Sequence, residues 1–229
     1  PVLTMNVNII GTLNILDSVR ELKLSCRIML IGSGEQYGYI REHEVPITED
    51  TLLRPGNPYA VSKASQDMIG QVYSRAYDID LIMMRAFNHI GPGQDLGFVV
   101  PDFCRQIAEI EKGKREPVIK VGNLDARRDF TDVRDIVSGY LLAMKKGKKG
   151  SIYNIGSGKA IKIQYILDTL LELSNIGIRV ERDLQKMRPS DVPIIEADVS
   201  RLKNDTGWTP SIDVIKSLSD TLIYWRSKC

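Results

Sequence analysis

The sequence predicts an α/β protein organised around a parallel β-sheet. Short apolar segments alternate with segments of helical periodicity along its 229 residues. These apolar segments are almost continuously hydrophobic, as strands are when both faces of their sheet are covered. Loops rich in glycine and proline follow the first two of them. Strand–helix alternation of this kind is typical of parallel βαβ units.

The first expected helix and strand occupy the N-terminal part of the chain. From Ile10 to Val19 an apolar side chain recurs every three residues, which predicts a helix over residues 7–22. Residues 27–31 form a short apolar run that ends at Gly32, and this predicts a buried strand. A long loop over residues 33–56, rich in proline, glycine and acidic residues, follows this strand.

The next helix has a recognisable start. Asn57 can cap a helix and Pro58 suits its first turn, so we expect a helix over residues 57–77. Residues 80–87 then form an apolar strand, followed by a second glycine/proline loop over residues 88–100. Further helices are expected over residues 101–112, 133–146, 161–173, 199–206 and 211–225, and further strands over residues 118–121, 151–155 and 178–182.

Composition excludes several classes of protein. With 31 Lys+Arg against 29 Asp+Glu the net charge is +2, so we expect neither a nucleic-acid partner nor a membrane-surface partner. There is no uninterrupted apolar run of about 18 residues, so no membrane span is expected. Three scattered cysteines and two histidines predict neither a disulfide framework nor a metal site. We therefore expect the reducing cytoplasm.

The chemistry begins with Tyr59 and Lys63. Residues four apart share one face of a helix, so the phenol and the ammonium should be neighbours. A nearby cation stabilises a phenolate, and we therefore expect a Tyr59 pKa below the usual value of about 10. Such a tyrosine can give or take a proton. On spacing alone, a surface pair is the more ordinary interpretation.

A serine loop lies upstream of that helix. Residues 32–38 read Gly-Ser-Gly-Glu-Gln-Tyr-Gly and follow a predicted strand. Ligands of open α/β sheets bind at the carboxyl ends of strands. The Ser33 hydroxyl can therefore hydrogen-bond the same substrate oxygen that Tyr59 protonates.

Together these motifs resemble the extended branch of the short-chain dehydrogenase/reductase family, which acts on nucleotide sugars. The likeness extends along the whole chain. It includes the segments at residues 8–14, 46–50, 54–59, 85–93, 97–103 and 122–130. The last two are most similar to the GDP-sugar members. The resemblance implies an NAD(P)-binding Rossmann-type doubly wound parallel sheet with a smaller C-terminal α/β substrate domain.

The resemblance also implies roles for individual residues. Ser33, Tyr59 and Lys63 match the catalytic positions, and Glu35 matches the glutamate base of the dehydratases. Asn8, Tyr59 and Lys63 match cofactor-binding positions. The matches to sugar-nucleotide-binding positions are Asn88, Val99, Val100, Arg128 and Arg188. From the residues alone, Arg128 could instead pair with Asp129 or Asp132, and Arg188 with Asp191.

The implied reaction is NADPH- or NADH-dependent reduction of the 4-keto group of GDP-4-keto-6-deoxy-D-mannose to GDP-D-rhamnose. Gly34 favours reduction, because the dehydratases carry Asp or Ser there and glycine has no proton to give. A GDP-mannose 4,6-dehydratase, an NDP-sugar epimerase using the same triad, and an inactive sugar-nucleotide-binding protein remain alternatives. A homodimer is expected, because the first two long helices carry more than one apolar stripe.

The dinucleotide fingerprint has no match before Tyr59. A glycine-rich turn should open the first helix of a Rossmann fold. We expect this turn to lie in an upstream segment of roughly 90 residues, which corresponds to three strand–helix units. Residues 1–95 are therefore expected to form the C-terminal half of the dinucleotide-binding domain. Residues 96–229 should mainly form the sugar-nucleotide domain, with segments near 124–155 returning to the Rossmann sheet.

Overall fold

A computed structural model describes residues 1–174, 176–186 and 192–229. Its first sheet holds three parallel strands in the order β1-β2-β6: Arg27–Ser33, Asp80–Ala86 and Ile152–Ile155. β1 and β2 pair in register from Arg27 opposite Asp80 to Ser33 opposite Ala86. The predicted α/β class with parallel strands is confirmed.

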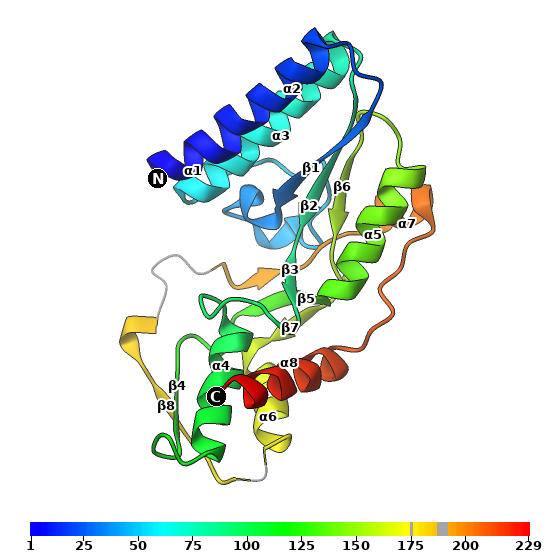
Figure 1. Cartoon of the computed structure of the whole chain (residues 1–229). Coiled ribbons are helices and arrows are strands. Elements are labelled where there is room, and N and C mark those ends of the chain that lie inside the picture. The colour runs from blue at the N-terminus through cyan, green and yellow to red at the C-terminus, as the bar shows by residue number, and fades with distance from the viewer. Residues whose placement is uncertain (175, 187–191) are drawn as a thin grey trace.

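Both faces of this sheet are covered by helices (Figure 1). Along β2, Leu81 and Met83 pack with Leu16 in one core cluster, which involves α2 (Gly11–Glu21) and α3 (Pro58–Ala76). The alternate residues Ile82 and Met84 join a second cluster with α5 (Val133–Lys146). Successive strand side chains point to opposite faces, so an uninterrupted apolar strand serves two layers.

α1 (Val2–Met5) continues through a π-helical turn at Asn6–Ile10 into α2. This continuous helical stretch lies side by side with α3 (Figure 1). α3 approaches the sheet at Gly70, where a Cβ would lie only 2.5 Å from Leu30 Cδ1. A larger residue there would require the Leu30 side chain to move.

The helical stretch Val2–Glu21 is also long and apolar enough to cross a membrane, with a mean hydropathy of 1.3. The sequence has no uninterrupted apolar run of this length, because polar residues such as Asn6, Asn8 and Asn14 lie between the apolar ones. Only 17% of this window is buried, so most of its surface is open to a partner of some kind.

The C-terminal half contains two further sheets. Its elements include β3 (Asn88–Ile90), β5 (Arg127–Asp132), β7 (Ala160–Lys162) and β9 (Ile194–Ile195), which form one sheet. β4 (Val118–Val121) pairs with β8 (Arg179–Arg182) in the other. The remaining elements are α4 (Val99–Glu111), α6 (Ile163–Glu172), α7 (Ser200–Thr206) and α8 (Val214–Lys228).

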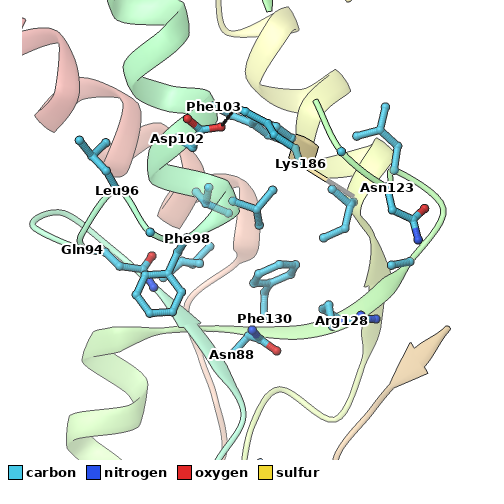
Figure 2. Close-up of a pocket in the computed structure, with 18 of the residues that line it drawn as sticks. Asn88, Gln94, Leu96, Phe98, Asp102, Phe103, Asn123, Arg128, Phe130 and Lys186 are labelled. Atoms are coloured by element: carbon cyan, nitrogen blue, oxygen red, sulfur yellow. Dashed lines mark hydrogen bonds and ion pairs between the residues drawn. The ribbon is translucent and has the colours of Figure 1, made fainter. Parts of the chain in front are cut away.

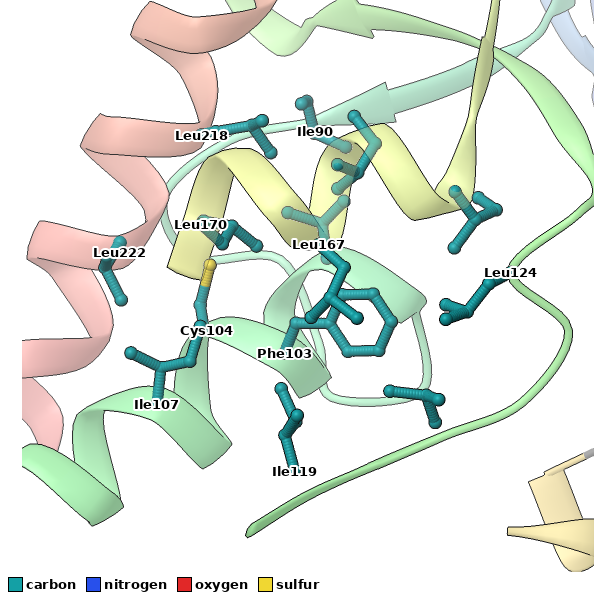
Figure 3. Close-up of a cluster of buried hydrophobic side chains, with 14 of the residues drawn as sticks. Ile90, Phe103, Cys104, Ile107, Ile119, Leu124, Leu167, Leu170, Leu218 and Leu222 are labelled. Carbon is teal, nitrogen blue, oxygen red and sulfur yellow. The ribbon is translucent and has the colours of Figure 1, made fainter. Parts of the chain in front are cut away.

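A single apolar cluster holds this half together (Figure 3). Phe103 and Ile107 on α4, Leu167 on α6 and Leu218 on α8 are all nearly or fully buried in it. Burial of side chains of this size stabilises a fold by roughly 1.5–3 kcal/mol each. This core supports the walls of the cavity described below.

All the helices and strands expected from the sequence are present. Their ends shift by at most three residues, except that the first helical stretch begins at Val2 instead of residue 7. Strands β3, β5, β7 and β9 were not expected. β5 reads Arg-Arg-Asp-Phe-Thr-Asp and is too polar for an apolar-run criterion, although Asp129 and Asp132 are buried in it. The other three have only two or three residues each and depend on pairing with distant segments.

Candidate active site

The start of α3 presents Tyr59. The Asn57 side chain accepts a hydrogen bond from the Ala60 backbone N–H at 2.8 Å, and Pro58 occupies the first turn. This is the cap that the sequence predicts. Tyr59 therefore lies in the first helical turn, where the side chain is 42% exposed.

The serine loop is a short 3₁₀ turn over Gly34–Tyr37 that directly follows β1. Ser33 caps it: its Oγ accepts a hydrogen bond from Glu35 N at 3.2 Å. In return, Gln36 Oε1 accepts one from Ser33 N at 3.1 Å. These reciprocal bonds fix the serine at the strand end.

The Ser33 hydroxyl lies beside the Tyr59 phenol, and its polar interaction with the phenol lowers the Tyr59 pKa. The larger influence is partial burial of the phenol, which raises the Tyr59 pKa, and the nearby Glu35 charge acts in the same direction. The net effect is a Tyr59 pKa above its usual value of 10.0. The phenol is thus protonated and able to act as an acid at neutral pH.

The predicted lowering of the Tyr59 pKa by Lys63 is therefore wrong for this structure. Lys63 Nζ donates to the Ile31 carbonyl at 2.6 Å and to Gln66 Oε1 at 3.1 Å. Helical spacing places the two residues on one face, but these acceptors hold the ammonium away from the phenol. Burial lowers the pKa of Lys63 itself.

Asn8 is connected to the same helix through one intermediate. Its Nδ2 donates to Ser62 Oγ at 2.9 Å, and Ser62 Oγ donates to the Tyr59 carbonyl at 2.7 Å. Asn8 lies in the π-helical turn, beside the first turns of α3. Its predicted contact with a cofactor stays a prediction.

A cavity of about 490 Å³ opens beside these residues. Asn88, Val99, Val100 and Arg128 line it, so four of the five expected sugar-nucleotide residues come together (Figure 2). The fifth, Arg188, lies outside the described residues. The cavity walls come from β3, α4, β5 and the segments around residues 94–98 and 122–126.

Glu35 joins the cavity to the predicted catalytic residues. It lines the cavity, accepts a hydrogen bond from Asn57 Nδ2 at 3.2 Å and raises the Tyr59 pKa through its charge. The chain around it therefore places Ser33, Tyr59 and the cavity next to one another. A substrate in the cavity could bring its reacting carbon to the phenol.

The carboxylates proposed as alternative partners of Arg128 have other partners. Asp129, fully buried, accepts hydrogen bonds from the backbone N–H groups of Ser157, Gly158 and Ala197. Asp132 is held by Arg134 at 2.7 Å. The Arg128 guanidinium donates to the Arg127 carbonyl at 2.8 Å and lines the cavity.

Gly34 is a point of close packing. A Cβ at this position would lie 3.2 Å from the Phe87 ring, so a larger residue would require that ring to shift by a few tenths of an ångström. Close packing against Phe87 therefore favours a glycine at position 34, where the dehydratases carry Asp or Ser.

Several site residues were missed from the sequence. Gln36, Asp67 and Arg85 form a buried polar network behind Ser33. The available signal was Arg85, a charged residue in an otherwise apolar part of its strand. Asp102 and Lys186 line the cavity. Asp102 stands in the GDP-type segment 97–103, whereas nothing in the sequence marks Lys186.

A parallel sheet with a serine at a strand end, beside a Tyr-x-x-x-Lys helix, defines the extended short-chain dehydrogenase/reductase class of NAD(P)-dependent enzymes. Within it, a family model described as GDP-mannose 4,6 dehydratase matches residues 1–221. The chain belongs to this family.

Its relatives include well-defined enzymes. The chain is 34% identical over 228 residues to GDP-6-deoxy-D-mannose reductase of Pseudomonas aeruginosa, covering 100% of this chain and 75% of that protein. The structure of RMD from Pseudomonas aeruginosa complexed with NADPH superposes with a TM-score of 0.93 at 34% identity, over 98% of this chain and 75% of the other. That of dTDP-glucose 4,6-dehydratase from Bacillus anthracis in complex with NAD gives 0.81 at 26% identity, over 98% and 68%.

Proposed function

We propose that this protein reduces the 4-keto group of GDP-4-keto-6-deoxy-D-mannose, with NADPH or NADH, to give GDP-D-rhamnose. The observation that carries the proposal is that Ser33 and Tyr59 lie together beside a cavity lined by the expected sugar-nucleotide residues. The similarity to GDP-6-deoxy-D-mannose reductase supports the same substrate.

The chain's own residues supply the proton and the orientation. Tyr59 gives its phenolic proton to the sugar O4 as that oxygen becomes an alkoxide, and Ser33 hydrogen-bonds the same oxygen. A positioned acid of this kind accelerates a reaction by about 10²–10⁴-fold. The tyrosine starts in the right form, because burial raises its pKa and keeps it protonated.

The residues that would hold the cofactor fit it by their donor chemistry. Lys63 and Tyr59 carry hydrogen-bond donors at the carboxyl end of β1, and such donors suit the hydroxyls of a ribose. When bound, the nicotinamide supplies the hydride for the sugar carbonyl carbon. Asn8 would steady the helix that presents both residues, through Ser62.

The substrate would lie in the cavity, with its pyranose near Glu35 and Asn88. Val99 and Val100 would contact the nucleotide, and Arg128 and Arg188 would bind the diphosphate, since guanidinium groups bind phosphate with two parallel hydrogen bonds. In this proposal residues 1–95 belong to the dinucleotide-binding domain and residues 96–229 mainly to the sugar-nucleotide domain.

A 4,6-dehydratase is the second candidate, because Glu35 lies beside Tyr59 and could serve as the base of the dehydration reaction. Gly34 argues for the reductase, since glycine offers no acid and its contact with Phe87 leaves little room for one. Incubation of the protein with GDP-4-keto-6-deoxy-D-mannose and NADPH or NADH tests the proposal. We expect loss of cofactor absorbance; unchanged absorbance would refute the reductase, and water loss from GDP-mannose would establish the dehydratase.

The exposed apolar face of the N-terminal helices is proposed to form a homodimer in the cytoplasm. Val7, Ile15, Met68 and Val72 are each at least 51% exposed on α2, α3 and the π-helical turn. Ala64, Ile69 and Tyr73 of α3 instead contribute to the core or pack beside it. Two apolar stripes on one helix call for two packing partners, the sheet and a second copy.

A further inference from the structure

One end of the cavity contains an ion pair that the proposed reaction does not use. Lys186 Nζ lies 2.6 Å from Asp102 Oδ2, and both residues line the cavity. Figure 2 places them at the opposite end of the lining from Asn88 and Arg128. Because Glu35 and Asn88 mark the reacting end, the ion pair lies where the far part of a bound nucleotide sugar would reach.

The pair is held in place from behind. Asp102 Oδ2 also accepts a hydrogen bond from Gln106 Nε2 at 3.0 Å, and Gln106 is only 4% exposed. The Gln106 Oε1 accepts from Lys120 N, and both Gln106 Nε2 and Lys186 Nζ donate to the Lys120 carbonyl. Surface ion pairs seldom have such support, so this carboxylate has a defined direction.

The pair still has capacity for a ligand. Among the described residues, no donor is bonded to Asp102 Oδ1. The two side chains are 33% and 35% exposed, which leaves both accessible from the cavity. Phe103, which lies next to Asp102 in Figure 2, also lines the cavity but is only 2% exposed, so the polar pair is what this end offers a ligand.

We infer that Asp102 and Lys186 read the base of the nucleotide sugar and select guanine. This rests on the proposed function only in taking the cavity to bind a nucleotide sugar. Guanine presents one acceptor, O6, followed by two donors, N1–H and N2–H₂. An ammonium beside a carboxylate matches this order: Lys186 donates to O6, and Asp102 accepts from N1–H and N2–H₂.

Other bases meet the pair with a mismatch. Adenine has an amine where guanine has O6, so the Lys186 ammonium would face a second donor. Adenine also has an unprotonated nitrogen where guanine has N1–H, so the Asp102 carboxylate would face a second acceptor. Uracil and thymine offer a single N–H between two carbonyls, and the second carbonyl would face the carboxylate. A carboxylate left beside an acceptor in a desolvated site opposes binding.

Equilibrium binding of nucleoside diphosphates to the whole protein tests this without requiring turnover. Wild-type protein should bind GDP at least about tenfold more tightly than IDP, which lacks only the N2 amine, and more tightly still than ADP or UDP. Equal affinities for GDP and IDP would overturn the inference. Failure of every nucleotide to bind would overturn the proposed function itself, together with this inference.

Asp102→Asn gives a gain as well as a loss. The amide keeps one acceptor for N1–H but offers a donor where the carboxylate had its second acceptor. GDP affinity should therefore fall at least about tenfold. XDP has a carbonyl at C2, so it should bind to this variant better than to wild type. Asp125→Asn, an exposed carboxylate paired with Lys162, is the matched control and should change neither affinity. If Asp102→Asn left the GDP/XDP preference unchanged, the assignment of the base reader would be wrong; the wild-type GDP/IDP ratio decides the matter if that variant does not fold.

Discussion

The side chain of Gln36 links the Ser33 loop to the buried carboxylate of Asp67. Gln36 Nε2 donates to Asp67 Oδ2 at 2.9 Å, while its Oε1 accepts from the Ser33 backbone. The same carboxylate oxygen accepts from Arg85 Nε at 2.8 Å. The serine proposed to face a substrate oxygen is thus held by a network in which Gln36, Asp67 and Arg85 are all almost completely buried.

Removal of Asp67 should destabilise the whole protein. In Asp67→Ala the Arg85 guanidinium, 3% exposed, loses its carboxylate, and an uncompensated buried charge typically costs about 3–5 kcal/mol. Urea unfolding measures this loss in the free energy of unfolding. Asp50→Ala, which removes an exposed partner of Arg201, should cost under about 1 kcal/mol. Equal effects of the two variants would mean that the buried network does not stabilise the fold.

Tyr59→Phe should abolish most of the activity. The substitution keeps the ring and removes the acid, so turnover should fall at least about 100-fold while GDP affinity changes little. Steady-state kinetics and GDP titration measure the two quantities. Tyr39→Phe, an exposed tyrosine outside the cavity lining, is the control and should retain activity. A loss under tenfold would show that another group or water delivers the proton.

The Tyr59 phenol should titrate above pH 10 in the protein without added cofactor. Partial burial, reinforced by Glu35, raises its pKa despite the polar interaction with Ser33. Because the folded-state pKa lies above that of the free phenol, the contribution of this group to stability is complete below pH 10 and is lost as pH rises through the folded value. The difference in tyrosinate absorbance between wild type and Tyr59→Phe measures it. A tyrosinate that appears below pH 9 in this difference would contradict the prediction.

Light scattering should find twice the mass of a single protein chain at micromolar concentration. Met68→Glu together with Val72→Lys should shift the protein to monomer, because these side chains are 54% and 51% exposed on the face proposed to pair. Leu184→Glu is the control, since Leu184 is 84% exposed but lies outside α3. A monomer at every micromolar concentration would rule out the dimer, and co-sedimentation with lipid vesicles would assign the face to a membrane.

Local signals predicted the fold well. The Asn57 cap and Pro58 located the start of the catalytic helix, and the apolar run of β2 identified a strand that is covered on both faces. β5 was not predicted, because its buried carboxylates accept hydrogen bonds from residues far along the chain. Asp129 accepts one from Ala197 N, and Asp132 accepts one from Ser217 Oγ. A polar strand whose buried carboxylates are satisfied by distant segments cannot be distinguished from a loop by local pattern.

The site was predicted less completely than the fold. Helical spacing correctly joined Tyr59 and Lys63 on one helix, but spacing could not show that the Ile31 carbonyl and Gln66 hold the ammonium. The Asp102–Lys186 pair brings together residues 84 positions apart. Such contacts depend on how α4 and the segment after β8 pack, and no motif encodes that.

The proposed reaction transfers one hydride to C4 of the sugar, with a proton from Tyr59. Reaction of GDP-4-keto-6-deoxy-D-mannose with cofactor that carries deuterium at the transferred position of nicotinamide C4 tests it most directly, with the product analysed by NMR and mass spectrometry. We predict one deuterium per product, located at sugar C4, with one cofactor oxidised for each sugar reduced. A product without deuterium, or cofactor that remains unoxidised while the sugar is epimerised or dehydrated, would contradict the account.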